Sequence, residues 1–169
     1  MAIRPIVRFP NPLLSRKAEA ITSFDPALEA LATDLLDTMR AAPGVGITAP
    51  HIGILQRVTV IELDRESGAR TFVNPEVVWH GDQMTKHTEG SVSMPGILEE
   101  VERPNAVRIR YQTLLGETIE EQADGFMAIC LQHEIDQLDG IFWTQRLSRL
   151  KRDRAVKKFE KLARDTRLG

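Results

Sequence analysis

The stretch QHEIDQLDG at residues 132–140 constrains this chain more than any other feature. It differs at one position from H-E-x-x-H, in which two histidines four residues apart lie on one helix face and bind one metal ion. The pattern predicts a helix over residues 124–138, with Glu134 as a general base beside His133. Gln137 stands in the place of the second histidine, and a carboxamide oxygen is a weak, neutral ligand for a transition metal. The sequence therefore keeps the base and one ligand and lacks the other.

Length and composition are typical of one soluble globular domain, which we expect to span residues 1–169. A chain of this length can bury a core without disulfides, and the single Cys130 cannot form an internal one. No apolar run approaches the roughly 18 residues that span a bilayer. Pro5, Arg8 and Pro10 interrupt the first residues, so no signal-peptide core is expected there. We therefore expect a cytoplasmic protein with no membrane partner.

The charge of the chain is uneven. Its net charge is −2, yet residues 146–169 carry ten Lys or Arg against three acids, which leaves +7 there and −9 on the first 145 residues. A helix is predicted over residues 149–164, with Leu150, Val156, Phe159, Leu162 and Ala163 as its apolar stripe. A basic helix of this kind either contacts nucleic acid or presents a solvated face.

Other segments predict a mixture of strands and helices. Asp25 and Pro26 suit the start of a helix over residues 25–42. Extended segments are expected at 57–63, at 71–79 with a turn at Asn74-Pro75, at 106–112, and after Gly116 at 117–122. Because strands and helices do not alternate regularly, the pattern favours an α+β fold over a doubly wound sheet.

Three motifs together resemble the peptide deformylase family. That family carries G-x-G-x-A-A-P-Q, then E-G-C-L-S, then Q-H-E-x-D-H-L. This chain has GVGITAPHIG at 44–53, EGSVSMPG at 89–96 and QHEIDQLDG at 132–140, in the same order and with the same spacing. The flanking segments VNPEVV at 73–78 and PGILEEVERP at 95–104 agree as well, so the resemblance covers nearly the whole chain.

The resemblance implies a fold, a reaction and a metal. The fold is α+β, with antiparallel strands around a central helix that carries the HExxH-type motif, plus a C-terminal helix. The reaction removes the formyl group from the N-terminal Met of new polypeptides. Iron, zinc or nickel is held by the Cys of the second motif and both His of the third. The Glu of the third motif is the catalytic base, and the C-terminal helix contacts the ribosome.

Carried over residue by residue, the resemblance leaves the metal set incomplete. Glu134 matches the catalytic Glu and His133 matches one ligand, but Ser91 stands at the Cys position and Gln137 at the second His. A serine hydroxyl does not readily become an anionic ligand. Losing two good ligands removes most of a binding free energy on the order of 10 kcal/mol. We therefore expect no divalent metal, or a substoichiometric amount.

The oxyanion-stabilising groups are partly changed. In the family, the Gln of the first motif and the backbone N–H after the Cys stabilise the developing oxyanion. Here His51 stands at the Gln position with Thr48 nearby, while Val92 keeps the backbone N–H. Gln and His have thus exchanged between positions 51 and 137.

The exchange leaves two interpretations open. One is a rewired metal site of His51 and His133, completed by His87 or by Cys130, which lies three residues before His133 on the helix. His87, Glu89 and Ser91 would share one face if their segment is extended. The other interpretation makes His51 and His87 ordinary polar wall residues, and Cys130 a small core residue.

The remaining candidate residues belong to the substrate pocket. We assign Gly44, Val45, Gly46, Glu89 and Cys130 to its wall. The glycines either let the backbone approach a bound peptide or simply form a turn. Asp136 is expected off the His133 face, as a surface or packing residue of the helix.

The favoured function is that of a peptide deformylase-like protein whose family reaction is weak or absent. One alternative is an active deformylase or related amidohydrolase with the rewired site. Another is a non-catalytic module that binds an N-terminal formyl-Met peptide, or that binds the ribosome through residues 149–164.

Overall fold

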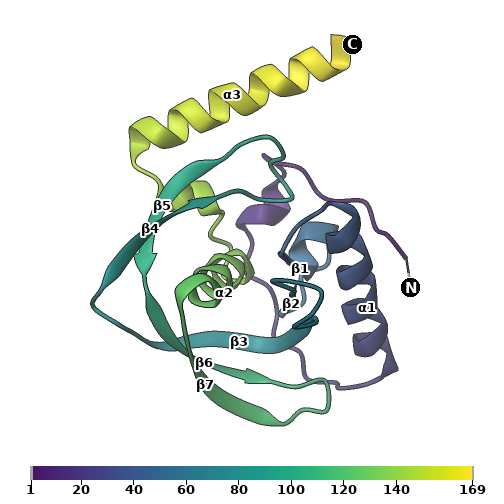
Figure 1. The fold of residues 1–169 in the computed structure, drawn as a ribbon. Coiled ribbons are helices and arrows are strands. Elements are labelled where there is room, and N and C mark those ends of the chain that lie inside the picture. The colour runs from purple at the N-terminus through teal and green to yellow at the C-terminus, as the bar shows by residue number, and fades with distance from the viewer. Residues whose placement is uncertain (1, 169) are drawn as a thin grey trace.

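In the computed structural model, which describes residues 2–168, a central helix is wrapped by antiparallel strands (Figure 1). The central helix is α2 (Gly125–Leu138), which carries His133 and Glu134. This arrangement is the predicted α+β fold, and the prediction is confirmed. The other helices and the strands have these bounds: α1 Pro26–Ala41, β1 Gly46–Thr48, β2 Val58–Ile61, β3 Arg70–His80, β4 Met84–Glu89, β5 Glu99–Pro104, β6 Ala106–Gln112, β7 Thr118–Asp124 and α3 Arg149–Leu168, with short 3-10 turns at Pro12–Ser15, Ala49–Ile52 and Trp143–Arg146.

Two antiparallel sheets position the site. Five strands pair in the order β1-β2-β3-β6-β7, and β4 pairs separately with β5. In β6 the side chains of Val107, Ile109 and Tyr111 are buried while those between them are exposed, which is the alternation of a half-buried strand. The buried side packs against α2 through Ala128, Leu131 and other residues of the shared core.

The turn predicted at Asn74-Pro75 is wrong, because β3 runs through it. The strand instead has a register shift between Val73 and Glu76 where it pairs with β6. Asn74 has a φ of 50°, and its side chain accepts a hydrogen bond from the N–H of Ile21 and donates one to the Ile21 carbonyl. Asn is one of the few residues other than Gly that adopt this left-handed conformation readily, and the two bonds to Ile21 hold its side chain in place.

Helix α1 forms for the reasons that its sequence suggests. The Asp25 carboxylate accepts a hydrogen bond from the N–H of Leu28 (3.0 Å), and Pro26 occupies the first helical position. Leu28, Leu35 and Met39 are buried against the core formed with β1 and β2. The helix thereby fixes the start of the segment 42–46, which enters the site.

The C-terminal helix α3 lies outermost in the molecule (Figure 1). It docks through Ala155 and Phe159, which are buried in a cluster with Phe142 and Trp143. The predicted apolar stripe is wrong at Leu150, whose side chain is 69% exposed, and Leu162 is also exposed. Within residues 2–168, none of the helices is both long and apolar enough to cross a bilayer.

Candidate active site

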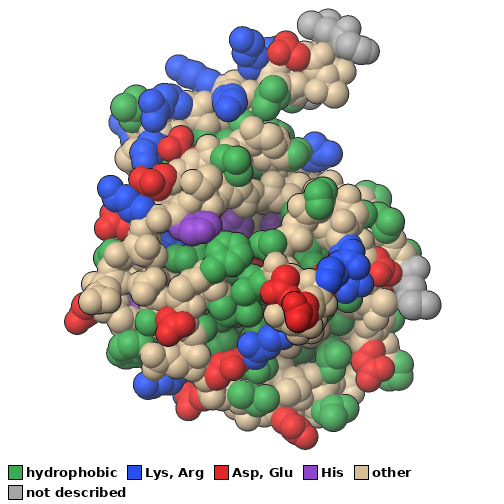
Figure 2. All heavy atoms as spheres, in the orientation of Figure 1, with side chains coloured by type: hydrophobic (Ala, Val, Ile, Leu, Met, Phe, Trp, Pro, Cys, Tyr) green, Lys and Arg blue, Asp and Glu red, His purple; other side chains and the backbone are tan. Residues whose placement is uncertain are grey.

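A cavity of about 420 Å³ lies between α2, the chain around β1 and the segment that joins β4 to β5. Figure 2 shows histidine side chains at the bottom of a hollow in this face, bordered by hydrophobic side chains. Residues 42–46, His51, 87–92 and 94–98 line it, and α2 contributes Phe126, Ile129, Cys130, His133 and Glu134. The structure therefore brings together every predicted site residue except Gln137.

Helix spacing places the α2 residues on one face. Phe126, Ile129, Cys130 and His133 recur at intervals of three and four residues, which lie above one another on a helix. Glu134 follows on the edge of this face and faces Gly46 of β1. A Cβ atom at position 46 would lie 2.8 Å from Glu134 Oε1. Gly46 therefore provides the space that the Glu134 carboxyl occupies.

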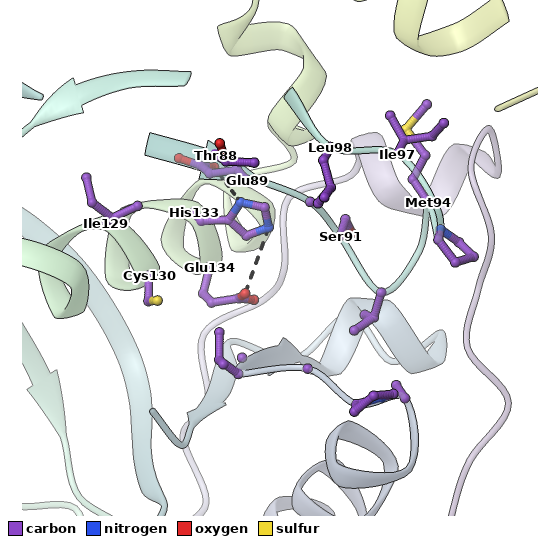
Figure 3. A pocket seen from close by; sticks show the side chains of 18 of the residues that line it. Thr88, Glu89, Ser91, Met94, Ile97, Leu98, Ile129, Cys130, His133 and Glu134 are labelled. Atoms are coloured by element: carbon purple, nitrogen blue, oxygen red, sulfur yellow. Dashed lines mark hydrogen bonds and ion pairs between the residues drawn. The ribbon is translucent and has the colours of Figure 1, made fainter. Parts of the chain in front are cut away.

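His133 is held by a buried chain of charges that begins at Glu89, and Figure 3 shows the link between these two residues. Its Nδ1 donates to Glu89 Oε1 at 2.8 Å, and Arg103 donates to both oxygens of Glu89 at 2.6 and 2.9 Å. Arg103 also donates to Asp136 Oδ2 at 2.8 Å, and Arg146 donates to both oxygens of Asp136. Asp136 is buried, so it is a packing partner of α2 and not a surface residue. The chain fixes the His133 ring with Nε2 left for the cavity.

The two carboxyl groups beside His133 have opposite pKa shifts. Burial disfavours the charge of Glu89, but the hydrogen bonds from His133 and Arg103 prevail and lower its pKa to about 2. Burial, together with the charge of Glu89, raises the pKa of Glu134 to about 7, and Glu134 Oε2 has no hydrogen-bond partner among the described residues. The nearest charged neighbour is His133, whose Nε2 lies 3.9 Å from Glu134 Oε1. Burial opposes the charge of His133, yet its bond to Glu89 and the charge of Glu134 raise its pKa.

His51 is a hydrogen-bond donor toward the cavity. Its Nδ1 accepts a hydrogen bond from the backbone N–H of Thr48 at 2.9 Å, so the proton of the neutral ring sits on Nε2. Burial, followed by the charge of His133, lowers the pKa of His51 to about 3 and keeps the ring neutral. The Nε2 atom is buried and has no hydrogen-bond partner within residues 2–168. A protonated Nε2 can donate to an oxyanion, but it offers no lone pair to a metal ion.

Gln137 does not join the site as the motif predicts. Its Nε2 donates to the backbone carbonyl of Leu14 at 2.8 Å, and the side chain is 2% exposed. The prediction that it shares the cavity face with His133 is therefore wrong. A carboxamide has an N–H to donate, and the Leu14 carbonyl satisfies it inside the core.

The other candidate ligands line the cavity without ligand chemistry. The Ser91 hydroxyl accepts a hydrogen bond from the Ser93 N–H at 3.1 Å. Burial, with the charge of Glu134, raises the pKa of the Cys130 thiol to about 12. His87 is exposed within β4, with its ring centroid 5.1 Å from that of Phe126. Across residues 2–168, no group of three or more His, Cys, Asp or Glu side chains is arranged to hold a metal ion.

Several apolar lining residues were not among the predicted site residues. Phe126 and Ile129 precede His133 by seven and four residues, so helical spacing around the motif was a sufficient signal. Met94, Ile97 and Leu98 follow the EGSVS segment and carry no such signal, because the loop between β4 and β5 has no regular period.

Comparison with known proteins gives one family. The model of the polypeptide deformylase family matches residues 3–153. A protein of Rhizobium meliloti named peptide deformylase-like is 68% identical over 97% of this chain and 95% of its own length. A peptide deformylase of Phenylobacterium zucineum is 45% identical over 97% and 99%. The crystal structure of a peptide deformylase from Legionella pneumophila superimposes with a TM-score of 0.90 and 38% identity, covering 98% of each chain. The chain belongs to the peptide deformylase family.

Proposed function

We propose that this chain is a peptide deformylase-like protein that binds an N-terminal peptide in the cavity but has weak or no metal-dependent deformylase activity. The observation that carries the proposal is the state of the two substituted ligand positions. Gln137 is bonded to the Leu14 carbonyl outside the cavity, and Ser91 offers only a neutral hydroxyl. One histidine, His133, is left from the three ligands that the family uses.

The residues near His133 do not fit the iron, zinc or nickel of the family. His51 would have to give up the hydrogen bond from the Thr48 N–H for its Nε2 to become a ligand. Cys130 would have to lose a proton from a thiol whose pKa is about 12. Such metals bind deprotonated thiolates and free imidazole nitrogens, so neither residue replaces a lost ligand without a cost.

Without a metal ion, Glu134 faces a weak nucleophile. The pKa of free water is about 15.7, whereas a catalytic zinc ion lowers it to about 7. The Glu134 carboxylate has a pKa of about 7, so it can take a proton from zinc-bound water but not readily from free water. The cavity nevertheless keeps groups suited to a peptide end: the His51 Nε2–H, the Val92 N–H and the apolar side chains of Ile97 and Ile129. These support binding more than turnover.

Metal content and turnover test the proposal together. Freshly purified protein should carry well under one transition-metal ion per chain, and hydrolysis of a formyl-Met peptide should be at background. Elemental analysis and release of formate are the measurements. Stoichiometric zinc, iron or nickel that survives dialysis, or turnover that disappears in Glu134→Ala, would show that the site is an active, rewired metal centre.

Binding is measured separately by calorimetry with a formyl-Met peptide. Ile129→Arg places a cation in the apolar wall and should weaken binding at least about tenfold, since a charge is then buried without a partner. Val78→Arg is the matched control, because Val78 is 38% exposed on β3 and does not line the cavity. Equal affinities of the two variants would mean that the peptide does not use this cavity.

We also propose that α3 contacts the ribosome. Figure 2 shows Lys and Arg side chains gathered over this helix. Arg149, Arg154, Lys157, Lys158, Lys161 and Arg164 are exposed, and Arg152 is half-buried. The docking residues Ala155 and Phe159 leave these cations free to face a phosphate backbone.

A further inference from the structure

The hydrogen bond between His133 and Glu89 fixes the direction of the imidazole. Nδ1 donates to Glu89 Oε1 at 2.8 Å, so the lone pair of the neutral ring lies on Nε2, which is on the cavity side and 3.9 Å from Glu134 Oε1. Arg103 holds the Glu89 carboxylate through both oxygens and prevents it from turning away. A carboxylate orients the histidine of a nucleophilic triad in the same way.

A serine lies in the same cavity as that nitrogen. Ser91 and His133 line the same cavity, and Figure 3 shows Ser91 on the side of the ring that carries Nε2. The Ser91 oxygen accepts its hydrogen bond from the Ser93 N–H, so its own proton is not used in that bond. Rotation of the Ser91 side chain about one bond moves this hydroxyl within the cavity, and contacts of this kind often shorten only when substrate binds.

Donors for a developing oxyanion lie in the same cavity. The Nε2–H of His51 is buried and has no hydrogen-bond partner among residues 2–168. Val92 follows Ser91 directly and also lines the cavity, so its N–H is the backbone donor next to the nucleophile. An unpartnered buried donor costs free energy until a ligand supplies an acceptor.

We propose that Ser91, His133 and Glu89 form a metal-independent triad that transfers the acyl group of small esters. The Ser91 Oγ attacks the ester carbonyl carbon while His133 Nε2 takes the hydroxyl proton, and the carbonyl oxygen becomes an oxyanion that the His51 and Val92 N–H groups receive. The intermediate collapses, the alcohol leaves with the proton from His133, and the acyl group stays on Ser91. Water then attacks the acyl-serine with His133 as base, which releases the carboxylic acid and restores Ser91.

Esters suit this arrangement better than formamides. An alcohol leaves more readily than an amine, so the triad needs no metal ion to activate the leaving group or the nucleophile. The proposal rests on the metal-free site described under the proposed function, and it is compatible with background turnover of formyl-Met peptides. The cavity of about 420 Å³ is large enough for a small acyl ester.

The test uses 4-nitrophenyl acetate with the full chain in the presence of EDTA. We expect a burst of about one nitrophenol per chain and an acetyl group on Ser91 by peptide mass mapping. Ser91→Ala should lower the rate by at least about 100-fold, since it removes the nucleophile. Ser93→Ala is the matched control, because the Ser93 hydroxyl is fully buried and lies outside the cavity; its rate should be unchanged.

A second pair of variants tests the roles of the other two members. His133→Gln should reduce acetylation of Ser91 by about 100-fold or more. Glu89→Gln keeps the shape but weakens the orienting bond, so it should lower the acylation rate and change how that rate depends on pH. Thermal melting checks that each variant folds.

The outcomes separate this proposal from the one on which it rests. Acetylation of another residue, or an equal rate in Ser91→Ala, overturns the triad and leaves the metal-free peptide-binding proposal standing. Turnover that EDTA abolishes and zinc restores overturns both.

Discussion

At the scale of single residues, Arg103 balances the buried charge beside the site. Its side chain is 4% exposed and donates to Glu89 on β4 and to Asp136 on α2. Removing one member of a buried ionic network leaves the others uncompensated, and this costs far more than the network itself contributes. The residue thus links the orientation of His133 to the stability of the fold.

Arg103→Met should lower the free energy of unfolding by about 3–5 kcal/mol, because Glu89 and Asp136 then lose a buried partner. Urea denaturation monitored by circular dichroism measures the change. Arg110→Met is the control, since Arg110 also bridges two carboxylates, Glu76 and Glu120, but all three side chains are about half exposed. We expect a loss of at most about 1 kcal/mol there. Similar losses at both positions would contradict a special role for the buried network.

The lowered pKa of Glu89 also predicts how the stability of the fold depends on pH. Its pKa falls from an ordinary 4.5 to about 2 in the folded chain, so the fold prefers the ionised form. The contribution is fully present above about pH 4.5 and is lost as the pH falls toward 2. Urea denaturation between pH 6 and pH 3 should show a steeper loss for the natural chain than for Glu89→Gln. Parallel pH profiles would mean that Glu89 is not stabilised in its ionised form.

At the scale of the element, α2 still presents two positions four residues apart. His133 points into the cavity, whereas the side chain at 137 is turned to the Leu14 carbonyl. The helix backbone continues through both positions to Leu138. The geometry needed for a second ligand is thus present in the backbone, and the difference lies in one side chain.

Ser91→Cys combined with Gln137→His should therefore recover metal binding, and His51→Gln should add activity through the oxyanion. The double variant gives up the Gln137 hydrogen bond, which costs roughly 1 kcal/mol of stability. Elemental analysis and formyl-Met-peptide hydrolysis are the measurements. Ser91→Cys with Gln132→His is the control, because Gln132 is bonded to the Pro104 carbonyl and does not line the cavity. Tight metal binding without activity in the triple variant would mean that the pocket differs in more than its ligands.

Sequence spacing predicts local features of α1 and α2 and misses contacts between residues far apart in the chain. The interval from Phe126 to His133 and the cap at Asp25 follow from neighbours in the chain, so they can be read from the sequence. The partner of Gln137 is Leu14, 123 residues away, and no local pattern indicates it. The tautomer of His51 likewise depends on which nitrogen meets the Thr48 N–H, and this requires the turn at Ala49–Ile52 in three dimensions.

At the scale of the whole molecule, α3 docks through apolar side chains and leaves its charged side chains exposed. Phe159 packs edge-on against Phe9, with ring centroids 6.1 Å apart, while cations occupy the exposed faces. The same helix extends along the outside of the molecule (Figure 1). A change of its exposed charges should therefore alter binding of a polyanion without unfolding the domain.

Reversing Lys157, Lys158 and Lys161 to Glu should abolish co-sedimentation with ribosomes at low salt. The natural chain should lose its binding steeply between about 50 and 200 mM salt, since each neutralised phosphate releases counterions. Reversal of Lys17, Lys86 and Arg108, which are exposed outside α3, is the matched control. Equal co-sedimentation of both variants, or none for the natural chain, would leave α3 as an ordinary charged surface.

Because of the hydrogen bond from Gln137 to Leu14, the order in which Gln137→His and Ser91→Cys are introduced matters. A chain that regains histidine at 137 first loses a buried hydrogen bond and leaves the Leu14 carbonyl without its donor, while no thiolate is present to hold a metal. A chain that regains cysteine at 91 first loses only the hydroxyl that accepts from the Ser93 N–H. The substitution at position 91 therefore costs less stability than the one at position 137, so a laboratory selection for deformylation should fix the thiol before the imidazole.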